Sequence, residues 1–196
     1  MRGSCKKVKV IAWLCAFIAT SSYAIDDPKY LIRDMINEKR NIISYVDTNK
    51  MARIILGTNR INFSKEQMND FVNMFEIIIV KSYNNYILNS DRKIDLLSSR
   101  YSGNIAIVNG RLDGLGVKFM LYLDKHQEWK IYNLAIDGVN YGILYRTIYK
   151  ESIEMCGVED FLLKLRKKLE PKGIGQVSGG IWEILGFLWF RPPFRS

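Results

Sequence analysis

An alternating stretch near the middle of the chain limits the possible folds more than any other feature. Apolar residues from Leu115 to Leu123 recur at every second position, as in a strand with one buried face and one wetter face. The polar turn Asp124–Glu128 separates this strand from a second one, which is predicted over Trp129–Ile136. Strands joined by so short a turn run antiparallel. The chain is therefore expected to contain an antiparallel sheet.

The sheet is predicted to begin before these two strands and to end soon after them. Strand patterns start at Ile94, and Ile105–Val108 is rich in strand-forming residues. The dipeptides Asn109-Gly110 and Asp113-Gly114 are typical of tight turns between strands. Asp137-Gly138 is expected to end the sheet.

Helices are predicted in front of the sheet. Asp26-Asp27-Pro28 is a typical helix start, and a second helix is expected between a cap at Asp47 and a stop at Gly57. Ser64 to Gln67 has the capping-box pattern, which predicts a long helix over Lys65–Leu88. This helix is apolar on more than one stripe, so neighbouring elements must cover it on two sides.

Two further helices are predicted behind the sheet. The first runs over Val139–Met155 and is broken at Gly157, and the second runs over Val158–Leu169 and is ended by Pro171. The order of helices, then strands, then helices predicts an α+β domain.

The first 24 residues have the three parts of a secretory signal. A basic start without any acid precedes the apolar run Val10–Ala19, and Ser22-Tyr23-Ala24 places small residues where a signal peptidase cuts. We expect cleavage after Ala24 and export of the mature chain. A retained membrane anchor is the alternative, but the apolar run is shorter than the roughly 20 residues that span a bilayer.

Removal of the signal changes the properties of the chain. It leaves 172 of the 196 residues, and the loss of four basic residues lowers the net charge from +9 to +5. Cys156 is then the only one of the three cysteines that remains, so an internal disulfide is excluded. Export and the scattered positions of the basic residues argue against nucleic-acid binding. Acidic lipid head groups or acidic protein partners fit the charge better.

Residues for catalysis or metal binding are scarce. One histidine excludes a site of several histidines, and three cysteines fall short of a four-thiolate zinc site. His126 lies in a polar turn, Cys156 has no plausible histidine partner, and the aspartates lack the spacing of a calcium loop. The glycine-rich segment 173–179 has no strand before it and is interpreted as a linker. We expect no metal, no cofactor and no catalytic residue.

The apolar residues allow two interpretations. The helix with two apolar stripes faces a sheet that carries Val117, Phe119 and Leu121, with Ile131 or Tyr132 on the neighbouring strand. These side chains form either a closed core or a layer that stays partly open and holds an apolar ligand. Taken alone, the residues favour the closed core.

A series of motifs follows in order over roughly residues 27–169. They are Met51–Gly57, Ser64–Gln67, Phe71–Phe75 with Tyr83, Trp129–Leu134, Asp137–Val139, Tyr145-Arg146 and Gly157–Leu162. Their order and spacing, behind a signal peptide, resemble the MlaC-type periplasmic phospholipid-binding proteins, also called the toluene-tolerance family. Asn133 and Asn140 depart from the family pattern, which usually has Asp and Ser there. Both replacements keep polarity and hydrogen bonding.

The resemblance implies a cone-shaped α+β fold like that of nuclear transport factors. A curved antiparallel sheet of about four to five strands and the helices would enclose an apolar pocket. It also implies a role in lipid transport, in which the protein carries phospholipid between an outer-membrane lipoprotein–porin complex and an inner-membrane ABC transporter and so maintains outer-membrane asymmetry. Such a carrier is expected to be a monomer that contacts membranes transiently. Its ligand is phospholipid, and it is not an enzyme.

Strand alternation and helix spacing select nine candidates for the pocket. Their expected role is to give the pocket its shape and keep it dry, and Tyr145 also brings a hydroxyl towards the mouth. The candidates are Phe71, Phe75, Ile78, Val117, Phe119, Leu121, Ile131, Val139 and Tyr145.

The predicted domain boundaries are residues 1–24 for the signal peptide, 25–170 for the lipid-binding domain and 171–196 for a glycine-rich linker with an apolar aromatic tail. Two other functions stay open. A small enzyme acting on an apolar substrate would need Asp137 as a buried acid. A secreted interaction module would use the tail around Trp182 and Trp189 on a membrane or a protein. The tail is equally compatible with a disordered or aberrant extension.

Overall fold

The computed structural model describes residues 26–38, 41–85 and 93–170. The predicted signal peptide, the predicted tail and the last part of the helix predicted to reach Leu88 lie outside these residues. Within them the fold is α+β, as the sequence predicted. The elements are α1 (Pro28–Glu38), the 3-10 helix η1 (Ile42–Tyr45), α2 (Thr48–Leu56), the 3-10 helix η2 (Gly57–Asn62), α3 (Lys65–Tyr83), β1 (Ile94–Ser102), β2 (Ile105–Leu112), β3 (Leu115–Leu123), β4 (Trp129–Ile136), β5 (Val139–Asn140) and α4 (Tyr141–Leu169).

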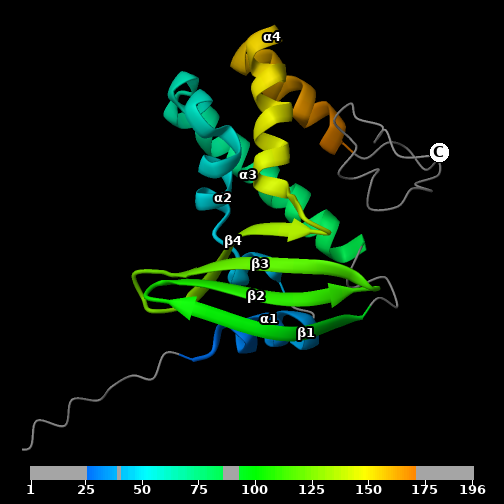
Figure 1. Ribbon diagram of the computed structural model, residues 1–196. Coiled ribbons are helices and arrows are strands. Elements are labelled where there is room, and N and C mark those ends of the chain that lie inside the picture. Colours follow the sequence, from blue (N-terminus) through cyan, green and yellow to red (C-terminus); the bar gives the residue numbers. More distant parts are fainter. Residues whose placement is uncertain (1–25, 39–40, 86–92, 171–196) are drawn as a thin grey trace, which may run out of the picture.

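The strands form one antiparallel sheet in the order β1-β2-β3-β4-β5. α1 lies against the strands, whereas α2, α3 and α4 gather beyond β4 at one edge of the sheet (Figure 1). β2 and β3 bury every second side chain and expose most of those between, which confirms the alternation that the sequence showed. The sheet thus has one covered face, and the helices determine what that face meets.

Two apolar cores hold these parts together. One lies among α2, α3 and α4 and centres on Phe71, Tyr149 and Phe161, whose rings contact one another. The other lies between α1 and strands β2 to β4 and includes Ile32 and Val108, both fully buried. The helices and the sheet therefore each have a core of their own, and the space where the two cores meet is the place to look for a cavity.

The helix caps follow the sequence closely. Asp47 accepts the Lys50 N–H at the start of α2, and the full capping box of Ser64 and Gln67 begins α3. Gly157 is non-helical, with φ 77° and ψ 170°, and divides α4 into the two predicted helical segments. α4 starts at Tyr141 rather than Val139 because Val139 and Asn140 form β5.

Of the two turns predicted around β2, the structure contains one. Asp113 and Gly114 take positive φ values of 51° and 87° and form the tight turn between β2 and β3. The prediction of a turn at Asn109-Gly110 is wrong, because both residues lie inside β2. A Cβ at Gly110 would lie 2.9 Å from the Asp95 carbonyl oxygen, beside an irregularity in the β1–β2 register. Glycine is required there by the close approach of a neighbouring strand.

Asp137-Gly138 also forms a tight turn, but the sheet does not end there. Asp137 and Gly138 have φ values of 49° and 81°, and they lead into β5, which pairs with β4. The prediction that the sheet ends at Asp137-Gly138 is therefore wrong, because the sheet continues for two more residues, Val139 and Asn140. α4 starts directly after them, at the edge of the sheet.

Candidate functional site

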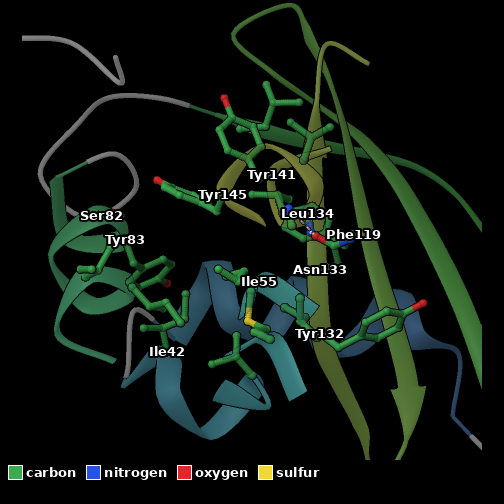
Figure 2. A pocket seen from close by; sticks show the side chains of 18 of the residues that line it. Ile42, Ile55, Ser82, Tyr83, Phe119, Tyr132, Asn133, Leu134, Tyr141 and Tyr145 are labelled. Carbon is green, nitrogen blue, oxygen red and sulfur yellow. Dashed lines mark hydrogen bonds between the residues drawn. The ribbon is translucent and has the colours of Figure 1, made fainter. Parts of the chain in front are cut away.

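A cavity of about 210 Å³ lies between the sheet and the helices, where the two cores meet. Figure 2 shows it from close by, with Ser82 and Tyr83 on one side and Phe119, Asn133 and Leu134 on the other. Its lining is apolar apart from a few hydroxyl groups and one side-chain amide. The lining residues are Met35, Ile42, Val46, Met51, Ile54, Ile55, Phe75, Ile78, Ile79, Ser82, Tyr83, Ile94, Leu112, Val117, Phe119, Ile131, Tyr132, Asn133, Leu134, Ile136, Tyr141, Gly142 and Tyr145.

Each helix contributes one stripe to the cavity. α3 contributes Phe75, Ile78, Ile79 and Ser82, whose spacing of three, four and seven places them on one helix face. α2 contributes Met51, Ile54 and Ile55 with the same spacing. α4 contributes its first turns, from Tyr141 to Tyr145. The walls are thus the parts of amphipathic helices that would form a closed core if the elements stood closer together.

β4 lines the cavity with consecutive residues, which a regular strand cannot do. Met120 pairs with Asn133, whereas Leu121 pairs with Ile131, so the register shift leaves Tyr132 without a residue opposite it. Such a bulge bends the strand and resets its alternation. It explains why Ile131, Tyr132, Asn133 and Leu134 all reach the lining.

A small polar network joins β4 to the start of α4. The buried Asn133 accepts the N–H of Gly142 through Oδ1 at 3.1 Å and donates from Nδ2 to Asn140 Oδ1 at 3.0 Å. Asn140 Oδ1 also accepts the Ile143 N–H and so caps α4. A Cβ at residue 142 would lie 2.8 Å from Asn133 Oδ1, so glycine is needed there. The network fixes the angle at which α4 leaves the sheet.

The same network contains the two residues that depart from the pattern expected from the resemblance. Asn133 and Asn140, which stand where that pattern has Asp and Ser, are hydrogen-bonded to each other. Asn140 Oδ1 accepts two hydrogen bonds, so its partner at position 133 must be a donor. A serine at 140 would instead donate its hydroxyl to an aspartate while still capping the helix. Each pair is thus consistent within itself.

The hydroxyl groups at the cavity differ in their bonding. The Tyr83 hydroxyl donates to the Met35 carbonyl oxygen at 2.5 Å and ties α3 to α1, and burial raises the pKa of Tyr83. The Ser82 Oγ is buried and has no hydrogen-bond partner within the described part of the chain. A buried hydroxyl without a partner carries a desolvation penalty, which a polar atom of a ligand would relieve.

A charged cluster lies behind Tyr132. The Tyr122 hydroxyl donates to Asp47 Oδ2, and the Lys50 ammonium lies 3.1 Å from the centre of the Tyr122 ring and 4.9 Å from that of Tyr132. Burial, followed by the Asp47 hydrogen bond, raises the pKa of Tyr122 to about 12, and burial lowers the pKa of Lys50. These contacts anchor the start of α2 to β3 and β4.

The structure brings six of the nine candidate residues to the cavity, namely Phe75, Ile78, Val117, Phe119, Ile131 and Tyr145. Phe71 is fully buried one helical turn before Phe75 and stacks on its ring. Leu121 is fully buried in the core between α1 and the sheet. Val139 lies in β5, is 42% exposed and is not part of the lining.

The stripe on α2 was missed, although the spacing of Met51, Ile54 and Ile55 was a usable signal in the sequence. Ile94 and Leu112 were also missed. They lie at strand ends, and no local pattern marks a strand end as part of a cavity wall.

The residues considered for catalysis lie away from the cavity. Asp137 is exposed in the turn before β5, and His126 is exposed in the turn between β3 and β4. Cys156 is half-buried and donates its thiol proton to the Ser152 carbonyl oxygen. Within residues 26–38, 41–85 and 93–170 no group of three or more metal-ligating side chains comes together. In the same ranges, none of the helices combines the length and apolar character that crossing a bilayer requires.

Comparison with known proteins supports the motifs. The model of the MlaC protein family matches residues 16–167, which is well over half of the chain. The chain belongs to the MlaC family. No curated protein sequence matches it. The resemblance that the sequence motifs predicted is therefore confirmed at the level of the family.

A solved structure similar to this MlaC-family chain is the phospholipid-binding protein from Ralstonia solanacearum, determined in complex with a phospholipid. The two share 15% sequence identity and a TM-score of 0.58, and the match covers 74% of this chain and 85% of that protein. At this identity the likeness is one of fold. It confirms the predicted fold class for this MlaC-family chain.

Proposed function

We propose that this MlaC-family protein binds a phospholipid whose acyl chains lie in the 210 Å³ cavity. The observation that carries the proposal is an apolar cavity between sheet and helices in a chain whose fold resembles a protein solved with a phospholipid. Each methylene group taken out of water contributes about 0.8 kcal/mol, so the roughly seven that this volume accommodates contribute about 6 kcal/mol before the cost of ordering the lipid is subtracted. The cavity therefore needs only its shape and its dryness to hold such a ligand.

The protein would act as a carrier in the periplasm. It takes phospholipid between an outer-membrane lipoprotein–porin complex and an inner-membrane ABC transporter, and so maintains the asymmetry of the outer membrane. The family membership and the leader-like first 24 residues support this role. Such a carrier works without catalysis, and the exposed positions of Asp137 and His126 agree with that.

The ligand is tested by producing the full chain with its leader, purifying the protein from the periplasm and analysing the extracted lipids by mass spectrometry. We expect about one phospholipid molecule per protein. A protein that is consistently free of lipid after mild purification would contradict the proposal.

The leader and the carrier role need separate measurements. The intact mass of the same preparation shows whether the chain begins at Ile25, as cleavage after Ala24 requires. Transfer of a fluorescent phospholipid from donor to acceptor vesicles, with and without the protein, tests movement of the ligand. A protein that holds lipid but never exchanges it would be a storage protein rather than a carrier.

A further inference from the structure

A second hollow, of about 480 Å³, lies between the end of α2, η2 and α4. Its lining contains four cationic side chains and no acidic one. The lining residues are Lys50, Arg53, Ile54, Gly57, Thr58, Arg60, Ile61 and Arg146. Lys50 lies on the rings of Tyr122 and Tyr132, so the cations that face solvent in the hollow are the exposed Arg53, Arg60 and Arg146.

The arginines of this hollow have no acidic partner within residues 26–38, 41–85 and 93–170. Within the described residues the ion pairs of the chain are Lys130–Glu128, Lys150–Glu154 and Arg166–Asp70. None of them involves an arginine of the hollow. Like charges gathered in a concave surface repel each other and raise the local concentration of anions. A bound anion would relieve that repulsion.

Arg146 is held in place as a binding residue would be. Its Nε–H donates to the Ile54 carbonyl oxygen at 2.7 Å, so its side chain bridges α4 and the end of α2. Gly57 makes room for it, since a Cβ at that position would lie 3.2 Å from Arg146 Cδ. An arginine has five N–H donors, and this bond uses one of them. The terminal nitrogens of Arg146 have no hydrogen-bond partner in the part of the chain that the structure describes, so they can bind an oxyanion in the paired geometry that guanidinium groups favour.

The hollow and the apolar cavity share a wall. The side chain of Ile54 lines both. On α2, Met51 and Ile55 line the cavity, whereas Lys50 and Arg53 line the hollow. On α4, Tyr145 lines the cavity and its neighbour Arg146 lines the hollow. A phospholipid whose glycerol lay over Ile54 would place its acyl chains in the cavity and its phosphate in the hollow.

We propose that the hollow lined by Arg53, Arg60 and Arg146 binds the phosphate group of the phospholipid whose acyl chains lie in the neighbouring cavity. This assignment rests on the proposed function. It gives the carrier a preference for phosphate-containing lipids, whereas the apolar cavity alone would accept any lipid with the same chains.

The test compares two lipids with identical acyl chains, a phosphatidylglycerol and a diacylglycerol, which lacks the phosphate. Delipidated mature protein is loaded from vesicles of each composition, and the bound lipid is measured. The variant is R53Q/R60Q. The matched control is R100Q/R111Q, which removes the same charge from exposed arginines on β1 and β2. A second arm titrates inorganic phosphate into each delipidated protein by calorimetry.

We expect the wild type and the control to prefer phosphatidylglycerol. In R53Q/R60Q the preference for phosphatidylglycerol over diacylglycerol should be about tenfold smaller, which corresponds to roughly 1.4 kcal/mol. This variant should also bind inorganic phosphate more weakly. The same preference in all three proteins would overturn the assignment and leave the proposed function intact. Phosphate binding that depends on Arg53 and Arg60 without any change in lipid preference would assign the hollow to a soluble phosphate compound and overturn the lipid assignment. Failure of the wild type to take up either lipid would contradict the proposed function itself.

Discussion

Filling the cavity should separate its effect on stability from its effect on binding. Ile78→Trp places a larger side chain into the lining, and Ile77→Trp makes the same change one residue earlier on α3, where the side chain is 45% exposed. In a protein core, space that is left unfilled costs about 24 cal/mol per Å³. A tryptophan adds roughly 60 Å³ to isoleucine, which recovers about 1.4 kcal/mol by the same measure.

The same side chain would displace part of the lipid. The added volume equals about two methylene groups at roughly 0.8 kcal/mol each, so affinity should fall about fifteenfold. Urea unfolding of delipidated protein gives the stability, and lipid retained after loading from vesicles gives the affinity. We expect Ile78→Trp to be more stable and to retain less lipid, and Ile77→Trp to match the wild type in both. Lipid retention that is equal in the two variants would refute an acyl chain in this cavity. Ile78→Phe serves as a smaller step should the tryptophan overfill the site.

Three further predictions concern polar groups around the cavity. Ser82→Ala should stabilise the lipid-free protein by about 1 kcal/mol in urea unfolding, because it removes a buried hydroxyl that has no partner among the described residues. An unchanged stability would show that the hydroxyl is solvated. Asn133→Asp should lower the unfolding free energy by about 1–3 kcal/mol, because Asn140 Oδ1 would then face a carboxylate oxygen. In a double-mutant cycle, adding Asn140→Ser should recover most of that loss. Additive effects of the two substitutions would contradict the coupling. The raised pKa of Tyr122 makes its protonated form a source of stability that is present in full below pH 10 and is lost as the pH rises through about 12. The unfolding free energy should fall over that range and fall less in Tyr122→Phe, in which Tyr83, Tyr141 and Tyr149, whose pKa values are also raised, still contribute.

Short sequence patterns such as helix caps and turn dipeptides predicted most of the fold. The capping box at Ser64, the cap at Asp47 and the turn at Asp113-Gly114 each depend on neighbouring residues only, and each was predicted correctly. Asn109-Gly110 has the same turn signal, yet Gly110 serves the close approach of β1 to β2. Nothing in the local sequence distinguishes a glycine that turns the chain from one that lets a neighbouring strand approach.

Only part of the cavity could be predicted, because its lining also depends on how distant elements pack against one another. Helical spacing shows that Phe71 and Phe75 share a face of α3, but only the packing of α2 and α4 decides which of the two meets the cavity. On β4 the alternation predicts one buried face, while the bulge at Tyr132 turns four consecutive residues to the lining. Val139 lies in the short β5, whose pairing with β4 cannot be read from its own two residues.

The most direct test of the acyl-chain site is photo-cross-linking. A phospholipid with a photoreactive group near the end of one acyl chain is loaded into the protein, activated by light and mapped by peptide mass spectrometry. Acyl chains in the cavity should label lining residues such as Ile55, Ile78 and Phe119, and an excess of unlabelled phospholipid should suppress that labelling. Labels confined to exposed apolar residues such as Ile61 and Leu97 would show that the chains bind elsewhere on the protein and would contradict the proposed site.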